Sequence, residues 1–210
     1  MIRTTWVCAT LFALLGLGSV GHADDLEPMA AEMSQLFAQH LSELFNKENQ
    51  ERQTKFDVDP SQASGLRSGQ DGIIIVPAKG LKEGTVDPAV ETECGSGLCY
   101  LFMSPCYAPV INGQPVDAKK LRSVKFDNGE GEKREAVCLL VTVKHVEGDD
   151  WRLYAFGADQ KPVINSQFGL ADSAGDKTLA IKVNGAKDKK ANLELTLHKK
   201  YSASFSIANK

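Results

Sequence analysis

The alternation of side chains over residues 135–146 constrains the fold of this chain more than any other feature. Two sets of residues alternate there, with Val137, Leu139, Val141 and Val143 in one set and Cys138, Leu140, Thr142 and Lys144 in the other. Successive side chains of a β-strand point to opposite faces of a sheet, so the pattern predicts one long strand.

Shorter strand-like segments, separated by turn residues, follow one another at roughly ten-residue spacing. They span 73–76, 99–103, 110–116, 121–126, 151–156, 161–168, 178–183, 193–197 and 201–207. Asn112-Gly113 predicts a tight hairpin turn, and Asn184-Gly185 predicts the turn after 178–183. Short strands joined by hairpins indicate antiparallel pairing. We therefore predict a mainly β fold, an antiparallel β-sandwich or barrel-like sheet, preceded by one long amphipathic N-terminal helix.

That helix is predicted within residues 24–56, where apolar side chains recur at spacings of three and four from Leu26 to Phe45. Its apolar face needs a cover, which is either the sheet or a partner such as a second copy of the chain in a homo-oligomer. Residues 57–71 are rich in Ser, Gly and polar side chains and predict a flexible linker. The β domain then covers 72–210, with a possible sub-boundary at 170–177. The sequence does not decide whether 178–207 belong to the same sandwich.

Residues 1–23 have the pattern of a secretory signal peptide. Arg3 supplies the basic start, an apolar run covers residues 6–17, and Ala23 is a small residue suited to the position before cleavage. No stretch reaches the about 20 apolar residues of a membrane span. We expect an exported protein, periplasmic or secreted, without a membrane span. Its 24 Lys and Arg against 27 Asp and Glu argue against a nucleic-acid partner.

Four cysteines follow the signal segment, and an even number in an exported chain predicts two disulfides. Four cysteines allow three pairings, and the sequence does not decide among them. The bend Gly95-Ser96-Gly97 favours Cys94–Cys99 together with Cys106–Cys138. A zinc site is the alternative, but the chain has no Cys-x-x-Cys spacing, so we predict no metal and no other cofactor. A redox role for Cys94 and Cys99 is a further hypothesis.

The densest polar cluster of candidate site residues lies at the end of the long strand and in the turn after it. His145, Asp149 and Asp150, joined by Trp151 and Tyr154, are the candidate ligand-binding residues. An ordinary charged turn explains the acidic residues equally well. The chain has neither a His-x-x-x-His pattern nor a Gly-x-Ser-x-Gly elbow, and no catalytic residue is predicted.

The functional prediction is an exported binding or adaptor module, without a catalytic site, for a protein or small ligand that the sequence does not identify. Two alternatives stay open at this point: an extracytoplasmic hydrolase with an acidic site near residues 145–150, and a thiol–disulfide protein that uses Cys94 and Cys99.

Overall fold

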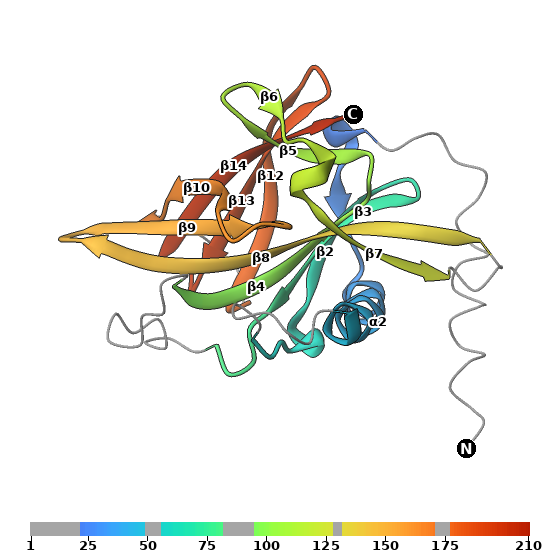
Figure 1. Ribbon diagram of the computed structural model, residues 1–210, viewed down its shortest axis with the longest axis horizontal. Coiled ribbons are helices and arrows are strands. Elements are labelled where there is room, and N and C mark those ends of the chain that lie inside the picture. Colours follow the sequence, from blue (N-terminus) through green and yellow to red (C-terminus); the bar gives the residue numbers. More distant parts are fainter. Residues whose placement is uncertain (1–21, 49–55, 82–94, 128–131, 171–176) are drawn as a thin grey trace.

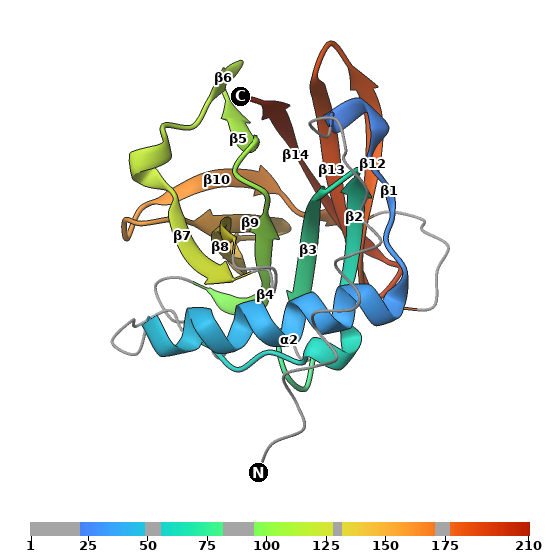
Figure 2. The same cartoon turned by 90° about the vertical axis from the view of Figure 1, so that its right-hand side faces the viewer.

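The computed structural model describes residues 22–48, 56–81, 95–127, 132–170 and 177–210. Within them the chain forms two antiparallel sheets and one α-helix, α2 (Ala31–Glu48). The strands of the larger sheet run across those of the smaller sheet (Figure 1), and α2 lies across the outer face of the larger sheet (Figure 2). The predicted mainly β, antiparallel fold with an N-terminal helix is confirmed.

The larger sheet has eight strands in the order β1-β2-β3-β4-β8-β9-β10, and β7 also pairs with β8. Their bounds are β1 (Glu27–Pro28), β2 (Ser64–Ser68), β3 (Asp71–Pro77), β4 (Ser96–Met103), β7 (Arg122–Asp127), β8 (Lys133–Glu147), β9 (Asp150–Phe156) and β10 (Pro162–Gln167). The longest strand is β8, and its hairpin with β9 extends beyond the body of the sheet (Figure 1).

The smaller sheet has six strands in the order β12-β13-β14-β5-β6, with β11 on β14. Their bounds are β5 (Tyr107–Ile111), β6 (Gln114–Pro115), β11 (Gly169–Leu170), β12 (Leu179–Lys187), β13 (Lys190–Leu197) and β14 (Tyr201–Asn209). Buried side chains of these last strands, among them Leu193, Leu195 and Phe205, join the core between the sheets. The C-terminal strands therefore belong to the same sandwich.

The alternation along β8 divides its side chains between two cores. Val137, Leu139, Val141 and Val143 lie in the core between the two sheets. Cys138 and Leu140 lie in a second core, on the face that α2 covers. The predicted alternation is confirmed for these six residues, and the stretch from Ala136 to Val143 is mostly apolar because both faces of β8 are buried there.

The helix α2 docks on the outer face of the larger sheet. Ala38, Leu41 and Phe45 are buried there, and the Phe45 ring packs edge-on against Tyr100 with the ring centroids 5.0 Å apart. The larger sheet therefore covers the apolar face of the helix, which is the first of the two predicted alternatives. Association of two chains through this helix stays a prediction.

The segment before α2 and the segment after it differ from the sequence prediction. Residues 24–30 form a 3-10 turn, η1 (Ala23–Asp25), and the short edge strand β1, where Pro28 needs no ladder hydrogen bond. Residues 57–71, expected to be a linker, hold the 3-10 turn η2 (Pro60–Gln62) and β2. Leu66 of β2 is buried between the sheets, which gives this Ser- and Gly-rich segment a place in the core.

One of the two predicted Asn-Gly turns lies where the sequence indicated, and the other does not. Asn112 and Gly113 have φ values of 51° and 80° and join β5 to β6, as an Asn-Gly hairpin turn requires. The turn after β12 lies instead at Asp188 and Lys189, with φ values of 53° and 62°, because the strand continues past Asn184 through a register shift.

Among the described residues, no helix has both the length and the apolar character that a membrane crossing requires.

Candidate functional site

The predicted cluster at residues 145–151 forms the tip of the β8–β9 hairpin. His145 and Trp151 are cross-strand partners with ring centroids 4.8 Å apart, and His145 Nε2 lies 2.6 Å from the carbonyl oxygen of Gly148. Asp150 Oδ1 accepts a hydrogen bond from Arg152 Nε at 2.6 Å. These polar groups therefore bind one another within the hairpin rather than facing a common cavity.

The remaining members of that predicted set lie apart from one another. Trp151 packs against the core between the sheets, whereas Tyr154 packs with Phe156 on the opposite face of the larger sheet. Asp149 is an exposed turn residue. Over the described ranges, no three His, Cys, Asp or Glu side chains are placed to hold a metal ion. The geometry at the hairpin tip matches the charged-turn interpretation.

The predicted Cys106–Cys138 bridge is wrong. Cys99, Cys106 and Cys138 are reduced thiols in the structure, and Cys94 lies outside the described residues. Cys106 packs against the core between the sheets, whereas Cys138 belongs to the core under α2, so the larger sheet separates their side chains. A disulfide requires Cβ atoms about 4 Å apart, and this separation prevents it.

Burial also makes the thiols poor nucleophiles. It raises the pKa of Cys99 far above the ordinary value. For Cys106, burial is the largest cause, and the neighbouring Asp71 carboxylate adds to it, so the pKa is about 12. A thiol of this kind stays protonated at neutral pH, and the thiolate is the reactive form. The environment of these cysteines therefore supports a structural role.

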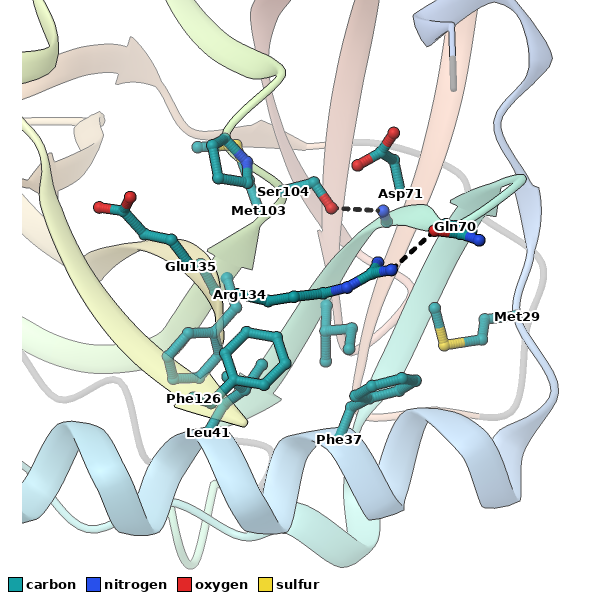
Figure 3. A pocket seen from close by; sticks show the side chains of 15 residues that line it. Met29, Phe37, Leu41, Gln70, Asp71, Met103, Ser104, Phe126, Arg134 and Glu135 are labelled. Carbon is teal, nitrogen blue, oxygen red and sulfur yellow. Dashed lines mark hydrogen bonds between the residues drawn. The ribbon is translucent and has the colours of Figure 1, made fainter. Parts of the chain in front are cut away.

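A pocket of about 240 Å³ lies between α2 and the larger sheet (Figure 3). Its wall is mostly apolar and includes Met29, Phe37, Leu41, Phe102, Phe126 and Ala136. Met29 lies between β1 and α2, and the other side chains come from α2 and from β4, β7 and β8, so the pocket forms only when helix and sheet dock.

Polar groups lie on one side of this pocket. Arg134 Nη2 donates a hydrogen bond to Gln70 Oε1 at 2.7 Å and lies 3.6 Å from Glu132 Oε2 (Figure 3 shows the bond to Gln70). Ser104 Oγ accepts the backbone N–H of Gly72 at 2.9 Å. The positive charge of Arg134 is thus accompanied by Glu132, and Glu135 also lines the pocket. This side offers hydrogen bonds without a net positive charge.

A second depression, of about 510 Å³, lies between the β5–β6 hairpin and the turn before β10. Most residues that line it are exposed, including Lys120, Asp159 and Lys161. Four of the ten residues that line it are charged: Asp117, Lys120, Asp159 and Lys161. The pocket under α2 has mostly apolar walls of buried and half-buried side chains with fewer charged residues, and it is the better candidate site, because ligand pockets are mostly apolar with a few polar groups.

The sequence contained only partial signals for this pocket. Phe37 and Leu41 belong to the predicted apolar face of the helix, and Phe126 and Arg134 flank a predicted turn. The β7–β8 register places Phe126 directly opposite Arg134, and sequence alone does not supply that register. The ring of His40 contacts Phe126 edge-on, with the centroids 6.2 Å apart.

Comparisons of the chain with protein-family models, with curated proteins and with solved structures find no match. The functional argument therefore depends on the geometry of this site.

Proposed function

We propose that the chain is an exported binding protein that holds a small, neutral, ring-containing molecule in the pocket under α2. The single observation that carries this proposal is the pocket itself, an apolar cavity with hydrogen-bonding groups on one side. An apolar cavity of about 150 Å³ binds benzene. A pocket of about 240 Å³ therefore has room for two fused rings or one substituted ring.

The polar side of the pocket favours a neutral ligand over a charged one. The guanidinium of Arg134 already has Gln70 and Glu132 as partners. An anionic ligand gains Arg134 as a partner but also approaches the carboxylate of Glu132, 3.6 Å from the guanidinium, which costs free energy at short range. A hydroxyl or carbonyl group can hydrogen-bond to the side chains of Gln70, Ser104 or Arg134 without this penalty.

Export supports a binding role outside the cytoplasm, and the pattern of residues 1–23 is its basis. The acid–base alternative near His145 has less support, because its polar groups hydrogen-bond within the hairpin. The thiol–disulfide alternative has less support, because burial raises the pKa of Cys99 and leaves a poor nucleophile.

Isothermal titration with 2-naphthol tests the proposal. We expect a Kd on the order of 10–100 µM, as is typical of a ligand of this size in an apolar pocket. The anionic analogue 2-naphthoate should bind at least tenfold more weakly. Absence of binding by either compound contradicts the pocket as a ligand site, and tighter binding of 2-naphthoate contradicts the neutral class.

Two aromatic-to-alanine variants provide the matched control. Phe126→Ala removes a wall of the pocket, and Tyr154→Ala removes a half-buried ring from the same face of the same sheet, outside the pocket. Binding of 2-naphthol should weaken at least tenfold in Phe126→Ala and stay within twofold in Tyr154→Ala. Equal losses in both variants indicate a general loss of structure and oppose the assignment.

A further inference from the structure

The N-terminal residues that the structure describes are part of the folded core. Ala23 is fully buried, and Leu26 is 9% exposed; both belong to the core between the two sheets. The turn η1, which begins at Ala23, contacts β2 in the larger sheet and β12, β13 and β14 in the smaller one. Figure 2 shows this segment beside the C-terminal strands. It closes one end of the sandwich.

Hydrogen bonds hold the same segment in place. The backbone N–H of Ala23 donates to Asn209 Oδ1 at 2.8 Å, and the N–H of His22 donates to Ser68 Oγ at 3.2 Å. The carbonyl oxygen of His22 accepts the N–H of Asp25 at 3.1 Å and so closes the 3-10 turn. Residues 22 and 23 together supply two backbone donors and one backbone acceptor to the fold.

Cleavage after Ala23, the position that the sequence favours, removes these three hydrogen bonds. It deletes a fully buried side chain and the acceptor that closes η1. Signal cleavage favours small residues at the last and the third-last position before the cut bond. Ser19 and Gly21 occupy these positions for a cut after Gly21, and His22, which follows that bond, is exposed.

We infer that a leader peptidase hydrolyses the Gly21–His22 peptide bond and that the mature chain begins at His22. The reaction consumes one water molecule, leaves a carboxylate on Gly21, and leaves an ammonium group on His22. This assignment rests on the export that the proposed function includes. It is independent of what the pocket binds.

The full chain, produced in a bacterial host with an active export pathway, tests the assignment. The intact mass of the exported protein should equal that of residues 22–210. A mass equal to that of residues 24–210 overturns the assigned bond but keeps export. An unprocessed chain retained in the cytoplasm overturns the assigned bond and the export proposal, but it leaves ligand binding by the pocket unaffected.

Thermal unfolding tests the physical reason separately from export. Chains that begin at His22 and at Asp24 are compared after removal of a cleavable tag that leaves no extra residue. The chain that begins at Asp24 should unfold at a midpoint roughly 3 to 8 °C lower. His22→Ala, which changes an exposed side chain and keeps the backbone, should leave the midpoint unchanged. Equal midpoints for the two chains overturn the structural role of Ala23.

Discussion

Substitutions at two buried alanines, one beside the pocket and one in the core, compare open space with close packing in this fold. Ala136 is 5% exposed and lines the pocket under α2, whereas Ala155 is fully buried between the sheets. Leucine adds three carbon atoms at either position. In Ala136→Leu these atoms enter the pocket, and the apolar area that they bury stabilises the fold by about 0.8 kcal/mol per carbon atom. The loss of side-chain entropy offsets about 0.5–1 kcal/mol of this gain. In Ala155→Leu they enter a close-packed core, which costs about 1–3 kcal/mol.

Urea unfolding of both variants measures the difference. The free energy of unfolding of Ala136→Leu should exceed that of the wild type by about 1–2 kcal/mol. That of Ala155→Leu should fall by about 1–3 kcal/mol. Isothermal titration should show that Ala136→Leu binds 2-naphthol at least tenfold more weakly, because leucine fills the pocket. A loss of stability in Ala136→Leu as large as in Ala155→Leu refutes the reasoning, because it means that no open space exists at Ala136.

Two further predictions concern Cys106 and Gly157. Cys106 has a pKa of about 12 in the folded protein against an ordinary value of 9.0, so the stability that its protonated thiol contributes is complete below pH 9 and falls as the pH rises toward 12. Urea unfolding between pH 8 and 11 should show a shallower decline for Cys106→Ala than for the wild type, and identical slopes oppose this. A Cβ at Gly157 meets the carbonyl oxygen of Lys120 at 2.1 Å, so Gly157→Ala should cost about 2–4 kcal/mol. Gly169→Ala, with nothing within 4 Å of the new Cβ, should change stability by less than about 0.5 kcal/mol, and similar costs for the two variants contradict the argument.

Local patterns were sufficient to predict most of the strands. The alternation around Leu139 assigns side chains to two faces, and that division does not depend on which strands lie beside β8. Asn112-Gly113 specifies its hairpin because both residues adopt positive φ. The segment around Leu66 was missed because strand β2 is short and rich in Ser and Gly, and its burial depends on neighbours distant in sequence.

The pairing of cysteines and the candidate site required information that is not local. Cys138 lies opposite Phe102 in the β4–β8 register, so it shares a face with Phe102 and not with Cys99. Nothing in the spacing of the cysteines reveals that register. The pocket likewise joins Phe37 of the helix to Phe126 of β7. Only the docking of α2 on the sheet brings those two residues together.

Nuclear magnetic resonance of the labelled protein with 2-naphthol tests the central claim most directly, because it locates the ligand. The account predicts that the shifted signals cluster at Phe37, Leu41 and Phe126, around the pocket under α2. Signals of Trp151, at the β8–β9 hairpin, should stay unchanged. Shifts that concentrate at that hairpin, or saturating 2-naphthol with no shifts at the pocket, would contradict the account.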